Sequence, residues 1–369
     1  MKIDVHAELL RDALGIEGAQ LLSREPLGDG SVSGFVVDAE GTQAFHYVDT
    51  SRLSVRAETG VATGDPKRPD ARIWLHPADP HLPALAAAAF SHSGPMLLSR
   101  IGIEHADAPE LVAYRPGRRA VLRADTPTGA VWIKIVRPSR VDRIVEAHRA
   151  CIEAGLPTPA VRGWSAEGLI VLDDAAGTPA LDADWEPEEL LDMVDRLRTG
   201  FAHVRTGPSR SGVASRLDWY LKHGVDSDGV QELGARVRSA LEAVGVQEPI
   251  ASHGDLHLGQ LFLDGPRISG VIDVDTVGTA APGEDPAAFV AHAVASALQS
   301  SGGAKTRFRA VADAAARRWS TIPGAAALTA AHLLGHAVAA ADVGDHSRAA
   351  ELLRCGSAIL SGETPFADL

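Results

Sequence analysis

The sequence predicts an α+β fold, with a small antiparallel sheet in its first half and a mostly helical second half. Two observations lead to this prediction. Residues 110–138 contain three runs that alternate apolar and polar side chains, the two-residue period of a half-buried antiparallel sheet. Beyond residue 185, apolar side chains recur mainly at helical spacing, and one strand-like segment at residues 250–278 interrupts them.

Length and composition agree with a globular protein of several parts. The chain has 369 residues, more than one domain usually holds, and 45% of them are hydrophobic and 22% charged. Changes of composition along the chain predict three segments, at residues 1–90, 91–176 and 177–369. We expect the first to be a cap, the second a small-sheet lobe with a connector, and the third a helical lobe.

The charge distribution argues against nucleic acid as a partner. Asp and Glu number 48 and Lys and Arg 35, a formal net charge of −13, and no basic run is long enough to follow a phosphate backbone. Cys151 and Cys355 have neither metal-ligand spacing nor a disulfide pattern, which indicates a reducing cytoplasm. Because no apolar run approaches the ~20 residues of a membrane span, we expect no membrane attachment.

The predicted cap begins with a short helix, VHAELLRDAL, at residues 5–14. Two strand-like runs follow, SGFVVDAEG and QAFHYVDTS, bounded by Gly and Asp residues that favour turns. The runs LVAYRP, RRAVLRAD and AVWIKIVRP then form the sheet of the second segment, with TPTG as the turn between the last two.

A helix is expected at residues 139–154, and Gly155 follows as its end. Its apolar face would consist of Val141, Ile144, Val145 and Ile152. The run GLIVLDD then predicts a buried strand that leads into an acidic connector. Long helical patterns follow at residues 188–204, 228–245, 287–299 and 326–343.

The residues that carry chemistry concentrate in two runs, SHGDLHLGQ at 252–260 and GVIDVDTVG at 270–278. Asp255 can orient a hydroxyl group, or it can cap a turn. Asp273 follows an apolar run and offers the kind of oxygen ligand that Mg²⁺ prefers. Asp275 would point to the same face if the strand continued in extended form, or would be an exposed loop carboxylate.

Lys134 stands in the middle of the apolar run AVWIKIVRP. An ammonium group among apolar neighbours is costly unless it meets a phosphate or a carboxylate. We therefore interpret Lys134 as a functional residue.

The order of these features resembles the aminoglycoside phosphotransferase and choline kinase group, whose fold is related to that of protein kinases. A sheet with a lysine, a helix with a glutamate, an acidic connector and a helical part with HGD and ID follow one another over residues 110–345. The text HGDLHLGQ is most similar to maltokinase and glucosamine-kinase-like proteins, where glutamine replaces the asparagine of most relatives. The resemblance implies a bilobal protein-kinase-like fold, here with an additional N-terminal α/β cap.

The resemblance also implies a reaction: transfer of the γ-phosphate of ATP, with GTP as the other candidate, to a hydroxyl group of a small molecule. The acceptor would be a sugar, an amino sugar or an aminoglycoside. Asp255 would be the catalytic residue that orients the hydroxyl and takes its proton. Asp273 would bind Mg²⁺, Gln260 would be a second ligand, and Asp275 could share the ion.

For the nucleotide, the resemblance implies that Lys134 holds the phosphates and Glu146 on the next helix holds Lys134, with Glu153 as the rival partner. Leu172 and Asp173 of the connector would contact adenine through their backbone. These two positions follow from chain order alone.

The histidines and the glycine loop have expected roles of their own. His253 would shape the catalytic turn through a bond from its ring to nearby backbone, and His257 could face the acceptor. The loop that covers the nucleotide would lie at YRPGRRAV, although Gly117 is its only glycine and no G-x-G-x-x-G motif is present.

Two other functions are consistent with the same residues. His253, Asp255 and His257 alternate along one run and, with Asp273 and the aspartate that follows it, could form a two-metal hydrolase site. That hypothesis leaves Lys134 without a role. The chain could also be a kinase-like binding protein without activity, although it retains the aspartates and the lysine that catalysis requires.

Overall fold

The computed structural model describes residues 4–363 except residues 40, 66–67, 208–211 and 224–227. The chain divides into two compact units. Unit 1 consists of Met1–Glu146 and Ala160–Asp174, and unit 2 consists of Ala147–Pro159 and Ala175–Leu369.

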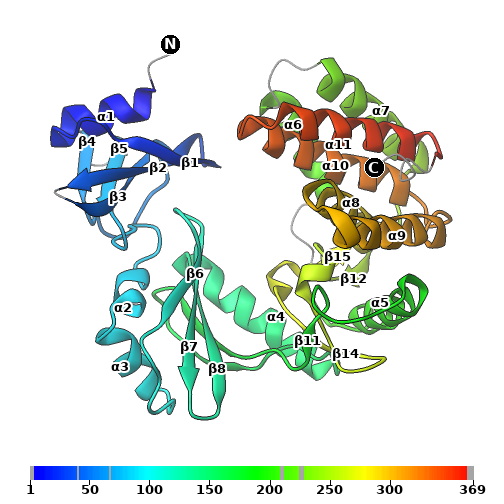
Figure 1. Cartoon of the computed structure of the whole chain (residues 1–369), viewed down its shortest axis with the longest axis horizontal. Coiled ribbons are helices and arrows are strands. Elements are labelled where there is room, and N and C mark those ends of the chain that lie inside the picture. The colour runs from blue at the N-terminus through cyan, green and yellow to red at the C-terminus, as the bar shows by residue number, and fades with distance from the viewer. Residues whose placement is uncertain (1–3, 40, 66–67, 208–211, 224–227, 364–369) are drawn as a thin grey trace. The chain divides into compact units, whose positions relative to one another are not determined.

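Unit 1 begins with helix α1 (Val5–Leu14), which lies on a five-stranded antiparallel sheet (Figure 1). The helix starts after its capping residue Asp4 and buries Leu10 in a cluster with Phe35 and Ile73. This arrangement confirms the α/β character predicted for the cap. The strands are β1 (Gln20–Leu27), β2 (Gly30–Ala39), β3 (Thr42–Asp49), β4 (Val61–Asp65) and β5 (Arg68–Leu75), in the spatial order β1-β2-β3-β5-β4.

A second five-stranded antiparallel sheet completes unit 1, and it contains the three strands predicted for residues 110–138. Ile133 and Ile135 pack on one face with the short helices α2 (Leu85–Ala89) and α3 (Ser93–Ser99). Val136 lies on the other face, with helix α4. The strands are β6 (Glu110–Arg115), β7 (Arg119–Thr126), β8 (Gly129–Val136), β9 (Val161–Trp164) and β10 (Leu169–Asp173), in the order β6-β7-β8-β10-β9.

Helix α4 (Val141–Glu153) follows the one-turn 3-10 helix η1 (Pro138–Arg140) and confirms the predicted helix with one correction. Ile152 was expected on the buried face, but its side chain is 43% exposed, and Cys151 is buried instead. Both residues satisfy the helical period, and Cys151 is buried because it packs into the core of unit 2. Gly155 adopts φ +78°, the left-handed conformation that commonly ends helices.

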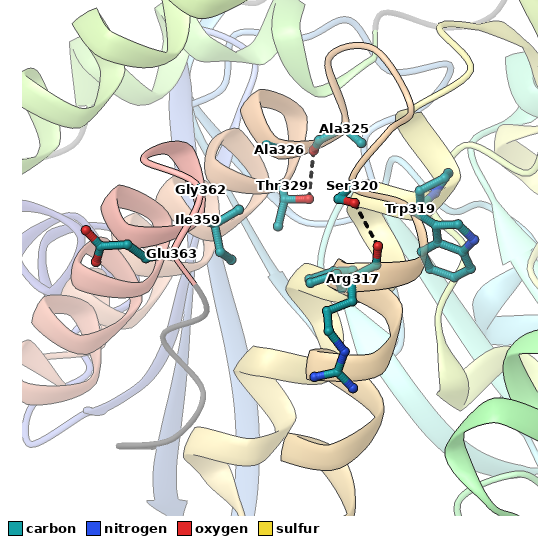
Figure 2. A pocket seen from close by; sticks show the side chains of 12 residues that line it. Arg317, Trp319, Ser320, Ala325, Ala326, Thr329, Ile359, Gly362 and Glu363 are labelled. Atoms are coloured by element: carbon teal, nitrogen blue, oxygen red, sulfur yellow. Dashed lines mark hydrogen bonds between the residues drawn. The ribbon is translucent and has the colours of Figure 1, made fainter.

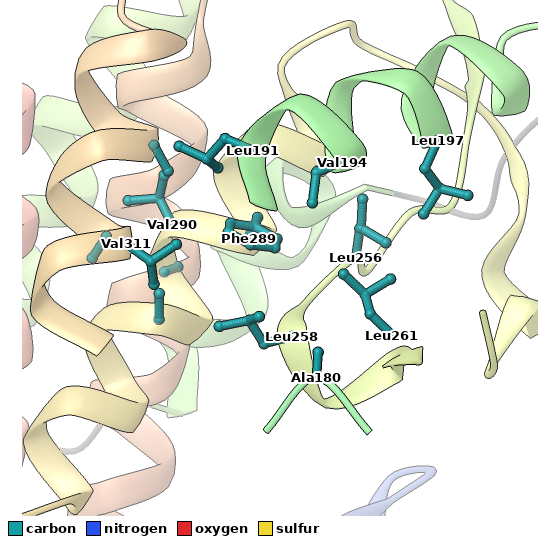
Figure 3. Packing of buried hydrophobic residues seen from close by; sticks show 14 of the residues in the cluster. Ala180, Leu191, Val194, Leu197, Leu256, Leu258, Leu261, Phe289, Val290 and Val311 are labelled. Carbon is teal, nitrogen blue, oxygen red and sulfur yellow. The ribbon is translucent and has the colours of Figure 1, made fainter. Parts of the chain in front are cut away.

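Unit 2 is mostly helical, as predicted, and α10 and α11 run side by side in it (Figure 1). Its core joins helices to a short non-helical segment: Leu256, Leu258 and Leu261 pack with Phe289 and Leu191 (Figure 3). The helices are α5 (Pro187–Phe201), α6 (Val213–His223), α7 (Asp228–Val244), α8 (Glu284–Gln299), α9 (Gly302–Arg318), α10 (Ala325–Asp342) and α11 (His346–Leu360).

The strand-like segment of unit 2 forms two small antiparallel sheets, ordered β11-β13-β14 and β12-β15. Strand β11 lies well before the segment predicted from sequence and pairs with β13, so the segment is not the only extended part of unit 2. Two one-turn 3-10 helices lie between the strands. The elements are β11 (Thr178–Pro179), β12 (Ile250–Ser252), η2 (Leu258–Gln260), β13 (Leu261–Leu263), β14 (Ile268–Val271), η3 (Val274–Thr276) and β15 (Gly278–Ala280).

The units and the three segments predicted from sequence divide the chain differently, because the boundary between the units falls within α4. The segments 1–90, 91–176 and 177–369 therefore stay a proposal about domains. Among the residues that the structure describes, no helix combines the length and the apolar character needed to cross a membrane.

Candidate active site

The candidate catalytic turn lies between β12 and β13, at residues 253–260 of unit 2. Leu256 is fully buried and Leu258 is 5% exposed, and both point into the core (Figure 3). Asp255 and His257 alternate with them and are only partly buried. The apolar residues thus anchor the turn, and the intervening polar side chains stay accessible to a ligand.

A buried carboxylate that the sequence prediction missed holds the start of this turn. Asp285, in the first turn of α8, accepts hydrogen bonds from the backbone N–H groups of His253 (2.9 Å) and Gly254 (2.7 Å). Gly254 has φ +86°, and a Cβ atom there would lie 2.9 Å from the carbonyl oxygen of Thr276. In the sequence, Asp285 belongs to an acidic pair at the start of the run EDPAAFV. Such a pair by itself predicts only a favourable interaction with the helix dipole, and not a contact with the catalytic turn.

His253 links the turn to the segment that follows β14. Its ring nitrogen Nε2 lies 3.1 Å from the carbonyl oxygen of Ile272, and the ring packs edge-on against Phe201 with centroids 5.4 Å apart. The hydroxyl of Thr276 donates to the carbonyl oxygen of His253 at 2.8 Å. The contacts therefore hold residues 272–276 beside the catalytic turn.

Asp273 lies on this neighbouring segment in the left-handed conformation, with φ 62° and ψ 35°. Strand β14 ends at Val271, and Asp275 lies in the 3-10 helix η3. The condition under which Asp275 would share a face with Asp273, an extended strand through both residues, is therefore not met, because β14 ends at Val271 and Asp273 has the left-handed conformation. Asp275 as a metal ligand now rests only on its closeness in sequence to Asp273.

Gln260 is 3% exposed and has a structural contact that was not expected. Its side-chain oxygen Oε1 accepts a hydrogen bond from the backbone N–H of His257 at 3.0 Å. In return, Nδ1 of His257 accepts from the N–H of Gly259 at 3.1 Å, which completes a capping box around η2. An amide oxygen has a second lone pair, so metal coordination by Gln260 stays a proposal.

His257 and His292 offer ring nitrogens within 4.8 Å of the Asp255 carboxylate, and His336 packs on His292; the sequence prediction missed His292 and His336. The ring of His257 stacks on that of His292 with centroids 4.3 Å apart and planes inclined by 26°, and His336 meets His292 edge-on at 4.7 Å. Nε2 of His292 lies 3.5 Å from Oδ1 of Asp255. His292 is seven residues after Asp285 on α8, two helical turns, so both face the catalytic turn.

The environment shifts the pKa values of these groups. Burial lowers the pKa of His257 to about 4 and that of His336 to about 3, and the nearby His292 adds to both shifts. For Asp255, burial would raise the pKa, but the hydrogen bond from His292 and the charges of the surrounding histidines hold it below its usual value. Asp255 is therefore an anion beside imidazoles, two of which are neutral at physiological pH.

Asp255, His257 and His292 offer ligand atoms within 4.8 Å of one another, the spacing of a possible metal site. Two features oppose a metal ion there. The imidazole rings of the two histidines are nearly parallel, so their nitrogen lone pairs do not converge, and Nδ1 of His257 already accepts a hydrogen bond. The group also lacks His253 and Asp273, which the two-metal hydrolase hypothesis requires.

Lys134 lies in unit 1, in the middle of β8, and is 6% exposed. Its backbone pairs with Val121 of β7 and Ile170 of β10. Because Ile133 and Ile135 face α2 and α3, alternation places Lys134 on the face that α4 covers. Glu146, its predicted partner, lies on α4 and is exposed.

Leu172 and Asp173 close strand β10. The backbone N–H of Asp173 donates to the carbonyl oxygen of Ala160 at 3.0 Å, and its side chain lies 3.3 Å from Arg162. This N–H is therefore already engaged, and the predicted adenine contact through it would require the strand end to rearrange. Leu172 packs partly against the cluster on α4.

The predicted nucleotide loop is the turn between β6 and β7, and a buried carboxylate holds it too. Asp79 accepts hydrogen bonds from the backbone N–H groups of Gly117 (2.7 Å) and His81 (2.8 Å) and from the hydroxyl of Tyr114 (2.9 Å). Gly117 has φ +67° and lies against Leu27 of the first sheet. Burial raises the pKa of Asp79.

A pocket of about 350 Å³ in unit 2 is separate from these groups (Figure 2). It lies between α8, the segment joining α9 to α10, and the end of α11, with Trp319, Ile359 and Glu363 among its lining residues. Within it, the hydroxyl of Thr329 donates to the carbonyl oxygen of Ala325 in the same helix, and the hydroxyl of Ser320, just after α9, donates to that of Arg317. The pocket includes none of the predicted site residues and is not part of the candidate active site.

The comparisons with known proteins agree with this geometry. A model of the phosphotransferase enzyme family (APH) matches residues 118–328, more than half of the chain. A comparison with curated proteins finds no match.

Several solved structures have a similar fold. A thermostable mutant of aminoglycoside phosphotransferase APH(4)-Ia in its apo form has a TM-score of 0.55 at 15% identity, over 72% of this chain and 97% of that one. A ternary complex of a thermostable mutant of the same enzyme with ADP and hygromycin B has a TM-score of 0.53 at 16% identity, over 72% and 97%. Amicoumacin kinase hAmiN in complex with AMP-PNP, Ca²⁺ and Ami has 0.53 at 14%, over 75% and 95%. At such low identities the likeness concerns the fold alone.

Proposed function

The chain belongs to the phosphotransferase enzyme family and is a small-molecule kinase, and we propose that it transfers the γ-phosphate of ATP to a hydroxyl group of a sugar or amino sugar. The observation that carries this proposal is Asp255. Its carboxylate is held as an anion on a turn anchored by buried leucines and by Asp285, which is the arrangement that orients an acceptor hydroxyl.

In the proposed reaction, Asp255 aligns the acceptor hydroxyl and takes its proton late. The acceptor oxygen forms a bond to the γ-phosphorus while the bond from that phosphorus to the β–γ bridging oxygen breaks, and ADP leaves. The proton of the acceptor hydroxyl passes to Asp255 and then to solvent. A carboxylate with a lowered pKa is a weak base, so its main contribution is to align the hydroxyl for in-line attack.

The residues beside the turn fit a hard divalent cation. Asp273 and Asp275 supply carboxylate oxygens, and Gln260 supplies an amide oxygen with one lone pair already engaged. Mg²⁺ held by these residues would neutralise charge on the phosphates and favour in-line transfer. We propose Asp273 as its main ligand, because it lies two residues after the end of β14 and Ile272 before it is tied to the turn through His253 and Gln260.

For the nucleotide, we propose that Lys134 binds the phosphates and Glu146 orients Lys134. The support is positional: Lys134 is buried on the sheet face covered by α4, and Glu146 belongs to α4. A buried ammonium needs anionic partners, and a nucleotide phosphate is one. Leu172 and Asp173 stay candidates for the adenine contact.

The surroundings of Asp255 favour an acceptor with little charge. The imidazoles of His257 and His292 lie beside it, and that of His257 is neutral at physiological pH, so it can exchange hydrogen bonds with hydroxyl groups but offers no charge to a polycation. This favours a sugar or amino sugar over an aminoglycoside, in keeping with the maltokinase-like text of the turn.

The test is a screen of acceptors with the purified protein, ATP and Mg²⁺, read by ADP release and by mass spectrometry of the product. The panel should contain neutral sugars, amino sugars and aminoglycosides, and a parallel series should use GTP. Release of ADP that requires an acceptor supports the proposal. Release of inorganic phosphate without any acceptor would support hydrolysis instead, and nucleotide binding without turnover would support a silent binding protein.

A further inference from the structure

The relation between α8 and the catalytic turn goes beyond the proposed function. Asp285 in the first turn of the helix fixes the backbone of His253 and Gly254, and two turns later His292 reaches the side chain of Asp255. One rigid helix therefore contacts both the backbone that carries the catalytic residue and the carboxylate itself.

The ring of His292 is held from two sides. His257 stacks on one face at 4.3 Å, and His336 from α10 meets the ring edge-on at 4.7 Å. The side chain is only 27% exposed, so few rotamers are open to it. With the ring fixed in this way, Nε2 is directed at Oδ1 of Asp255 at 3.5 Å.

We propose that His292 is a positioning residue for Asp255: its Nε2–H engages Oδ1 and leaves Oδ2 to accept the hydrogen bond of the acceptor hydroxyl. The contact itself does not depend on the proposed function, whereas its effect on turnover rests on that function. A contact of 3.5 Å is long for a charge-assisted hydrogen bond, and such bonds commonly shorten when a substrate is bound.

The two neighbouring histidines have other contacts in the structure. Nδ1 of His257 accepts the N–H of Gly259, so that ring is part of the turn's own capping box. His336 contacts the ring of His292 and has no hydrogen bond to Asp255 among the described contacts. Of these three histidines, His292 is the one that brings to Asp255 a donor from outside the turn.

The charges around Asp255 determine what removal of His292 would do. The titratable and charged groups that face the pair come from the turn and from α6, α8 and α10; they are His257, Arg216, Tyr220, Glu284, His332 and His336. Burial alone raises the pKa of Asp255, and the hydrogen bond from His292 is the largest of the effects that lower it. We therefore expect the pKa of Asp255 to be higher in a variant without His292.

The experiment compares two substitutions with a matched control. His292→Phe keeps an aromatic ring for the stack but removes the donor, and we expect kcat to fall about 10-fold, with the acid limb of its pH profile at higher pH. His292→Gln retains an N–H donor, and its kcat should be within about 3-fold of the wild-type value. His336→Phe preserves the packing on His292 and should leave kcat and the pH profile unchanged.

A second measurement does not need turnover. The side-chain ¹³C carboxyl signal of Asp255, assigned by its loss in Asp255→Asn, should titrate at higher pH in His292→Phe than in wild type and His292→Gln. Melting temperature and nucleotide affinity establish that each variant is folded. If the Asp255 titration is the same in all three folded proteins, or if His292→Gln is as impaired as His292→Phe, the inference is wrong. If wild type phosphorylates no acceptor, the proposed function fails, and the titration still decides the role of His292.

Discussion

Two buried aspartates, one in each unit, hold the candidate catalytic turn and the proposed nucleotide turn in the same way. Asp285 in unit 2 accepts the N–H groups of His253 and Gly254, and Asp79 in unit 1 accepts those of His81 and Gly117. In both cases a carboxylate substitutes for water at neighbouring backbone donors, and a glycine with positive φ allows the tight turn.

The difference lies in where each aspartate comes from. Asp285 and the turn it holds are both inside the matched region, residues 118–328, whereas Asp79 and Gly117 precede it. Asp79 comes from the segment after the first sheet, so the turn between β6 and β7 depends on a part of the chain outside that region. The support of the candidate catalytic turn thus lies within the matched region, and the support of the proposed nucleotide turn lies before it.

The largest expected effect concerns Asp255, which lies on the turn that Asp285 holds. Asp255→Asn keeps the shape of the side chain and removes the anion, so kcat should fall at least ~100-fold while nucleotide affinity changes little. Steady-state kinetics and nucleotide titration measure both quantities. Turnover near the wild-type rate would mean that Asp255 is not the catalytic residue.

The counterpart in unit 1 is Lys134. Lys134→Ala should lower kcat/KM for ATP by ~100-fold because the phosphates lose their cation, and Lys134→Arg should restore this only in part, since a planar guanidinium does not replace a compact ammonium group. Kinetics with varied ATP at saturating acceptor test this. Unchanged ATP kinetics in a folded variant would make the lysine structural.

Removal of the first supporting aspartate should cost stability as well as activity. Asp285→Ala leaves two buried N–H groups without an acceptor, so we expect the free energy of unfolding to fall by about 3 kcal/mol. Denaturant unfolding measures this, with the exposed Asp182→Ala as the control that should change little. A stability loss no larger than that of the control would show that the turn keeps its shape without Asp285.

The smallest effect is expected for the second supporting aspartate. Asp79→Asn places an amide N–H where a carboxylate oxygen accepted, which should cost about 1–2 kcal/mol and raise KM for the nucleotide several-fold, with kcat little changed. The exposed Asp29→Asn in the same unit is the control. An effect on kcat instead of KM would contradict the assignment of this turn to the nucleotide.

The pH dependence distinguishes this aspartate further. Burial raises the pKa of Asp79 in the folded protein above that of the unfolded chain, so wild-type stability declines as pH rises through the folded pKa. Asp79→Asn has no group that titrates there and should lack this decline. The stability difference between wild type and Asp79→Asn should therefore shrink as pH rises, which unfolding curves at several pH values would test.

The elements that the sequence determined by itself are those with a local periodic signal. The alternation in LVAYRP, RRAVLRAD and AVWIKIVRP predicted β6, β7 and β8, and the helical spacing predicted α4, α5, α7, α8 and α10. The sequence also predicted Asp255 and Asp273 as candidate site residues, because they lie within two short runs of fixed spacing. Burial on one face imposes such patterns on consecutive residues, so a single chain displays them.

Only the tertiary structure decided which residues from distant segments meet. His292 and His336 lie on apolar helices, where a histidine ordinarily signals a satisfied core group, and their contact with the catalytic turn depends on how α8 and α10 pack. The carboxylates of Asp79 and Asp285 support turns 38 and 31 residues away in sequence. Contacts between distant segments produce no periodic pattern in the sequence, because a hydrogen bond depends on the position of two atoms in space and not on their separation along the chain.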